Sequence, residues 1–135
     1  MIQRTRKKRR WASATVEMAV VTPLLLALLL GIIEYGWVFS IKQALVTAAR
    51  EGARTAALPG TSDQAIRDRI AEVLTPLGLT TYNVQLTRAT PLNPIETVRI
   101  TIPYADVTLV GSFFGPTNWD LGSRCSMRKE AAAGP

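Results

Sequence analysis

Glu17 is the most unusual chemical group in this chain, because it stands near the start of the apolar stretch ATVEMAVVTPLLLALLLGII at positions 14 to 33. By insertion scales, a charged side chain at the centre of a membrane helix costs about 2.5 to 3.5 kcal/mol. An acid in such a stretch must therefore meet an opposite charge or stay near the membrane boundary. Its chemistry would be ion pairing, and we take it as the first indication of function.

Groups that catalyse reactions are scarce. The chain has no His and one Cys, and it has neither a phosphate-binding glycine loop nor a nucleophile elbow, which excludes the commonest acid-base, zinc and hydrolase arrangements. Asp106 and Asp120 are isolated acids in or beside loops, where acids usually form turns. Calcium binding through Asn118 and Asp120 is the alternative. We predict no catalytic residues, no metal and no cofactor, and therefore a protein that is not an enzyme.

The positive charge is concentrated at one place. Six of the sixteen Lys and Arg lie within the first ten residues, in the run RTRKKRR, and the other ten are balanced by ten Asp and Glu. A nucleic-acid-binding protein would spread its cations over a face and alternate them with aromatic residues, so we exclude that partner. Positive-inside bias instead predicts a cytoplasmic N-terminus, with topology set by Arg6, Lys7, Lys8, Arg9 and Arg10.

The apolar stretch predicts a single membrane span. Residues 16–33 would form about 27 Å of helix, enough for a thin bilayer core, and aromatic residues typical of an outer membrane boundary follow it: Tyr35, Trp37 and Phe39. We assign 1–12 to a basic cytoplasmic leader and 13–41 to the membrane helix, with Pro23 producing a kink or a short melted stretch. Membrane lipids are thus a predicted partner. The alternative is a signal peptide, with a mature chain starting near Arg50.

The helical pattern continues beyond the membrane to Leu58, where Pro59 and Gly60 end it. Small residues recur every four positions in this extension, 42–60: Ala44, Ala48, Gly52 and Ala56, with a parallel row of Ala49, Ala53 and Ala57. Rows of small side chains allow the backbone of another element to approach the helix closely. They predict packing either against the chain's own globular part or against neighbouring subunits.

Residues 61–130 are predicted to form a small α+β domain, followed by a frayed tail at 131–135. Thr61 and Gln64 have capping-box spacing before a helix that ends at Pro76 or Gly78. The apolar stripe of this helix is Ile66, Ile70, Val73 and Leu77.

Alternating residues then predict an antiparallel sheet of about three strands. The apolar faces are Tyr82, Val84 and Leu86, then Val98, Ile100 and Ile102, and last Trp119, Leu121, Cys125 and Met127. The segment TPLNP at 90 to 94 predicts the turn of a hairpin, and the segment after Tyr104 predicts a loop or short surface helix carrying Phe113 and Phe114. Cys125 is expected to fill the apolar face of the sheet, with an intermolecular disulfide as the alternative.

Two segments together resemble a known family. The stretch SATVEMAVVTPLLLALLLGIIEYGWVF, with an acid before the apolar run and a proline within it, and the stretch AAREGARTAA after it are similar to the TadE-like proteins of tight-adherence (Flp-type) pilus systems. The terminal strand SRCSMRKE adds a weaker similarity. The two stronger segments cover about a third of the chain, and their combination is fairly specific.

The resemblance implies a minor pilin or pseudopilin that a prepilin peptidase cuts on the cytoplasmic side of the membrane. In the family pattern a small residue, usually Gly, precedes the cut, and Glu is fifth in the mature chain, followed by Phe or Tyr. This places the cut between Ala12 and Ser13, with Met18 in the aromatic position. The cut would remove the whole +6 charge and create an amine at Ser13 that can neutralise Glu17 of a neighbouring helix.

Two hypotheses follow. In the first, the protein takes part in the assembly or priming of a pilus, with other pilins and assembly proteins of the cytoplasmic membrane as partners, and with Glu17, Pro23 and the small residues at 44, 48, 52 and 56 as assembly residues. In the second, the chain stays uncleaved and its outward-facing domain recruits a partner through Phe113, Phe114 or a strand edge. Glu17 would then pair with Arg9 or Arg10, or reach headgroup water.

Overall fold

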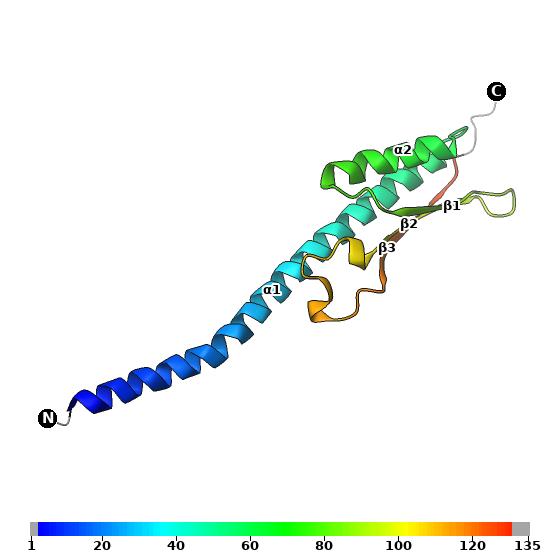
Figure 1. Ribbon diagram of the computed structural model, residues 1–135. Coiled ribbons are helices and arrows are strands. Elements are labelled where there is room, and N and C mark those ends of the chain that lie inside the picture. Colours follow the sequence, from blue (N-terminus) through cyan, green and yellow to red (C-terminus); the bar gives the residue numbers. More distant parts are fainter. Residues whose placement is uncertain (1–2, 131–135) are drawn as a thin grey trace. The chain divides into compact units, whose positions relative to one another are not determined.

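The computed structural model describes residues 3–130, and the side chains of 14–130. Two α-helices and three strands form it: α1 (Gln3–Ala57), α2 (Asp63–Leu74), β1 (Asn83–Thr87), β2 (Ile95–Pro103) and β3 (Asp120–Arg128) (Figure 1). Short 3₁₀ turns follow α2 and β2. The α+β class predicted from the sequence is confirmed. The chain divides into two compact units, Met1–Gly36 and Trp37–Pro135.

The first unit is the N-terminal part of α1. The helix is continuous through Pro23, although proline cannot donate the backbone hydrogen bond of its turn. The hydroxyl of Thr22 donates to the carbonyl of Met18, at 2.7 Å. The melted stretch expected at Pro23 is not present, and the kink that was its alternative stays a prediction.

The second unit has the C-terminal part of α1 and all of α2 packed on one face of a sheet. The strand order is β1-β2-β3, and both pairs are antiparallel. The register aligns Val84 with Ile100 and Ile102 with Leu121, so the apolar residues share one face. The buried core combines this face with Leu45 of α1 and Ile70 of α2. The apolar faces predicted from alternation are confirmed except at Trp119, which precedes β3 and is 47% exposed.

Helix α2 begins one residue later than the predicted capping box. Ser62 is the N-cap, and its hydroxyl accepts from the backbone N–H of Ala65 at 3.2 Å, whereas the hydroxyl of Thr61 donates to the carbonyl of Leu58. The predicted role of Thr61 as the N-cap of this helix was therefore wrong. The carbonyl of Leu58 lies just after the last residue of α1, and the Thr61 hydroxyl supplies it with a donor.

The other end of α2 also differs from the prediction. The helix ends at Leu74, a 3₁₀ turn continues to Leu77, and Gly78 has a φ of 75°. The tighter turn rotates the side chains relative to an α-helical register, so Leu74 is fully buried and Leu77 is 54% exposed. The predicted stripe is right for Ile66 and Ile70 and wrong for Leu77.

Two loops lie at opposite ends of the sheet (Figure 1). The β1–β2 turn closes through paired backbone bonds between Thr90 and Asn93, of 2.8 and 3.0 Å, as the hairpin prediction required. At the other end, residues 104–119 form a loop that we call the aromatic loop. Its ends are joined by a 2.9 Å bond from Tyr104 N to the carbonyl of Trp119, and by stacking of the two rings at 4.4 Å.

Candidate membrane-anchoring and assembly helix

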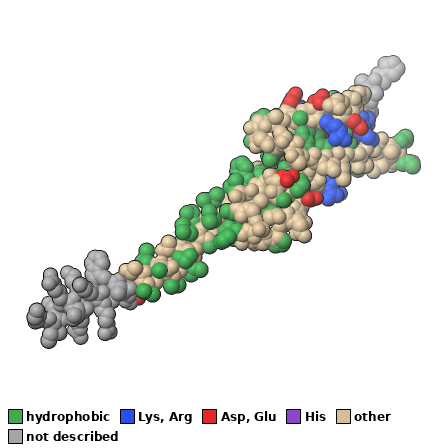
Figure 2. Space-filling view, in the orientation of Figure 1, with side chains coloured by type: hydrophobic (Ala, Val, Ile, Leu, Met, Phe, Trp, Pro, Cys, Tyr) green, Lys and Arg blue, Asp and Glu red, His purple; other side chains and the backbone are tan. Residues whose placement is uncertain are grey.

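Large apolar side chains cover the first part of α1 and remain exposed. Val20, Leu24, Leu28 and Ile32 are each more than 60% exposed. Figure 2 shows hydrophobic side chains over the visible face of this segment. The stretch Ala14–Ala57 contains a window of mean hydropathy 2.4, none of it buried within the chain, and it is long and apolar enough to cross a membrane. Water is a poor solvent for such a surface, so this segment fits a single-pass membrane anchor.

Glu17 interrupts this apolar surface near its beginning. Its side chain is exposed, as are those of Val16 and Met18, so it stands on the outside of the helix, where another molecule can reach it. A carboxylate surrounded by apolar groups favours a cationic partner once it leaves water. The geometry is compatible with the predicted ion pair between helices.

The remaining predicted site residues of the N-terminus lie outside the side chains that the structure describes. These are the cleavage positions Ala12 and Ser13 and the topology residues Arg6, Lys7, Lys8, Arg9 and Arg10. Their predicted roles stay predictions. Pro23 is exposed within the continuous helix, and nothing in its surroundings tests its part in assembly.

The small-residue rows pack inside the chain. Ala48 is fully buried and Ala56 is 2% exposed, while Ala44 is half-buried beside the same core. A Cβ added at Gly52 would lie 2.9 Å from Ile70 Cδ1 and 3.4 Å from Val98 Cγ1. Of the two alternatives left by the sequence, packing against the chain's own domain accounts for the small size of these residues. Their predicted role in assembly is not tested by these contacts.

A buried carboxylate was missed by the sequence analysis. Glu96 is 1% exposed on the inner face of the sheet, and Lys129 Nζ donates to its Oε1 at 3.0 Å. Arg88 Nη1 lies 3.8 Å from the other oxygen of Glu96, and Arg88 also donates to the carbonyl of Thr61 at 2.6 Å. The signal was present in the alternation, because Glu96 shares the parity of Val98 and Ile100. The cluster joins the turn end of the hairpin and the end of β3 to the α1–α2 connection, and has a structural role.

The outer face of the sheet carries an open recess of about 500 Å³. It is lined by Lys42, Arg99, Thr101, Asp120, Gly122, Ser123 and Arg124. Arg99 and Arg124 are direct cross-strand partners, an arrangement in which like charges repel, and Lys42 donates to the carbonyl of Gly122. The recess contains no nucleophile paired with a base. Among residues 14–130 no group of three or more His, Cys, Asp or Glu could hold a metal ion.

Comparison with known proteins agrees with the resemblance seen in the sequence. A family model described as TadE-like protein matches residues 12–54, which include the apolar span and most of the small-residue rows. The searches of curated proteins and of solved structures found no match. The recognition of a TadE-like sequence is thereby confirmed for this part of the chain. The match covers about a third of the chain, and it suggests a pilus-associated protein.

Proposed function

We propose that this protein is a membrane-anchored minor pilin or pseudopilin that takes part in the assembly or priming of a tight-adherence pilus. One observation carries the proposal: an apolar helix surface that the chain leaves bare, interrupted by one acid, lies within the stretch matched by the TadE-like model. A helix of this kind holds a protein in the bilayer. It can also offer Glu17 to a charge on a neighbouring helix.

The N-terminal domain boundaries and topology belong to the same proposal. The basic leader at 1–12 stays in the cytoplasm, the membrane helix covers 13–41, and the domain at 61–130 faces the outer side of the cytoplasmic membrane. Cleavage between Ala12 and Ser13 by a prepilin peptidase provides the amine that pairs with Glu17 of the next subunit. The buried small residues pack the domain against the extension at 42–60, and the cluster around Glu96 joins the hairpin to the α1–α2 connection.

Substitution of Glu17 tests the assembly mechanism. Glu17→Gln keeps the size of the side chain and removes its charge, so insertion should be unchanged or improved, while recovery of partner pilins with the purified protein should fall severalfold. Val20→Leu is the matched control, since Val20 lies on the same apolar surface and is 62% exposed. Equal recovery of partners with Glu17→Gln and Val20→Leu would remove the acid from the mechanism.

The N-terminus of the protein in its native membrane separates the open hypotheses. Intact mass and terminal peptide sequencing should show a chain that begins at Ser13. A chain beginning at Met1 would favour the uncleaved interaction module, in which the domain acts as a fixed anchor for a partner. A start near Arg50 would contradict the membrane helix altogether.

A further inference from the structure

The aromatic loop exposes a group of apolar side chains that the domain core does not use. Phe113 is 66% exposed, Leu109 56%, Phe114 48% and Trp119 47%. Residues 104–119 contain one charged residue, Asp106, and no Lys or Arg. Monomeric proteins seldom concentrate apolar side chains on a surface loop unless the loop binds another apolar phase.

The loop is ordered by its own backbone bonds. Val107 and Thr108 donate to the carbonyl of Tyr104 at 3.1 and 3.0 Å, and Gly115 donates to Ser112 at 3.2 Å. The turns need positive φ values of 60° at Gly111 and 144° at Gly115, which glycine adopts without strain. Phe113 and Phe114 are therefore held on the surface by the fold of the loop, with their rings edge to face at 4.9 Å.

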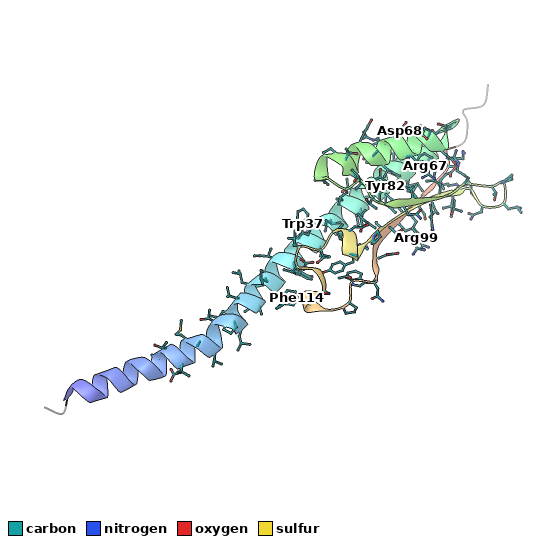
Figure 3. All side chains as sticks on the ribbon, in the orientation of Figure 1. Trp37, Arg67, Asp68, Tyr82, Arg99 and Phe114 are labelled. Carbon is teal, nitrogen blue, oxygen red and sulfur yellow. The ribbon has the colours of Figure 1, made fainter. Side chains whose placement is uncertain are left out.

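A hydrogen bond attaches the loop to α1 close to the apolar span. Trp37 Nε1 donates to the carbonyl of Val107 at 2.8 Å, and Val107 is buried in the core of the same unit (Figure 3 labels Trp37 and Phe114). Trp37 follows Ile33, the last residue of the apolar run at 16–33, by four positions, and it is one of the aromatic residues that the sequence places at the outer membrane boundary. The loop is therefore fastened to a residue that is expected at the membrane-water interface.

The opposite end of the domain has a different character. Glu130 N donates to the carbonyl of Ala57 at 2.9 Å, so the C-terminal end of α1 lies beside the hairpin end of the sheet. The charged groups of Arg88, Glu96 and Lys129 gather there. Strand β2 separates the two ends by about 27 Å. The end of the domain that contains Trp37 carries the aromatic loop, and the far end carries these charged groups.

We propose that the aromatic loop is a second membrane contact, in which Leu109, Phe113 and Phe114 insert into the headgroup region of the leaflet on the domain side. The inference rests on the membrane anchoring of α1 in the proposed function and adds a lipid-binding surface to it. Phe and Leu side chains are typical of surfaces buried at the headgroup-acyl boundary, and the loop carries a single charged side chain, Asp106, so few charges oppose insertion. Two contacts fix the tilt and rotation of the domain at the membrane, which one helix cannot do.

Fluorescent probes on the full chain test this contact. In a Cys125→Ser background, Phe113→Cys, Leu92→Cys and Leu28→Cys each receive the same environment-sensitive dye, and each protein is placed in nanodiscs of phosphatidylcholine and phosphatidylglycerol. Leu92 is the matched control, because it is 99% exposed at the hairpin turn and reveals any affinity of the dye itself for lipid. Leu28 reports the span, and Phe114→Cys provides a second position in the loop.

The expected result is strong quenching of the dye at Phe113 and Phe114 by nitroxides placed near the lipid headgroups, with iodide quenching severalfold weaker than at Leu92. The same quenching by iodide at Phe113 and Leu92 would overturn the proposal. A dye at Phe113 that is shielded from both iodide and nitroxide lipid would also overturn it, since the loop would then be covered by protein. If the dye at Leu28 is not quenched by nitroxides near the chain ends, the membrane anchor and the proposed function fail as well.

Discussion

The two stretches of α1 show how one helix can be suited to two environments, a lipid phase and the interior of the protein. Residues 14–36 carry large apolar side chains that stay exposed, whereas the side chains that residues 37–57 bury against the sheet and α2 are mainly small. In the first stretch, apolar surface area itself is what a lipid phase accepts. In the second stretch, small volume matters more than hydrophobicity, because it lets the helix axis approach its neighbours closely. The difference predicts that the same substitution has unlike effects in the two stretches.

The largest contrast should come from removing leucine side chains. Leu45 is fully buried and Leu28 is 61% exposed on the same helix. Leu45→Ala should lower the free energy of unfolding of the domain by about 2 to 5 kcal/mol, because it leaves a cavity. Leu28→Ala should leave it unchanged. Hydrogen exchange of the β2 amides in the detergent-solubilised full chain measures both, and an equal loss in the two variants would show that the stretches do not differ.

Loss of the buried carboxylate should have the next largest effect. Glu96→Gln removes the anion that faces Lys129 and Arg88, and charged hydrogen bonds of this kind contribute about 1.5 to 3 kcal/mol. Glu72→Gln is the control, since Glu72 is a 64% exposed acid that pairs with Arg69. Denaturant unfolding should separate the two variants. Identical midpoints would mean that the cluster around Glu96 is not a structural element.

Glycine substitution sharpens the comparison at the level of one methyl group. Gly52→Ala places a Cβ 2.9 Å from Ile70 and should cost about 1 to 3 kcal/mol through overpacking, less any gain in helix propensity. Gly36→Ala meets nothing within 4 Å and should cost nothing. Melting temperatures of the two variants in the same detergent measure this. A destabilised Gly36→Ala variant would contradict the assignment of open space around that residue.

The smallest effect should follow from the exposed ion pairs of Arg69, one within α2 and one to α1. Arg69 lies 2.7 Å from Glu72 and 3.0 Å from Glu51, and hydrogen bonds to Glu72 and then Glu51 raise the pKa of the Arg69 guanidinium. A pKa that is higher in the folded than in the unfolded protein stabilises the fold at every pH below the unfolded pKa. For Arg69 this stabilisation is lost only when the pH rises through the pKa of the folded state, far above neutrality. Arg69→Gln should therefore change the melting temperature little, and by the same amount at pH 6 and at pH 8. A clear difference between the two pH values would show that another titrating group is coupled to Arg69.

The fold was predicted well where local pattern decides it. Strand parity placed Val98, Ile100 and Ile102 on one face, and proline and glycine ended α1 correctly near Leu58. Prediction was weaker at the ends of α2, because Ser62 and Thr61 are both good caps and the choice depends on which hydroxyl reaches a free backbone group. The burial of Glu96 followed from parity, yet its partners come from residues far away in the sequence.

For the candidate site, the sequence by itself determined the chemical character of the protein: an apolar helix with one early acid, a basic run before it and small residues after it. Hydropathy and charge are properties of each residue and need no fold to be recognised. Only the tertiary structure decided that the small residues face the chain's own sheet, that Glu96 is enclosed by two cations, and that the aromatic loop is fastened to α1 at Trp37. These contacts join residues distant in sequence, and their partners are set by how the strands and helices pack.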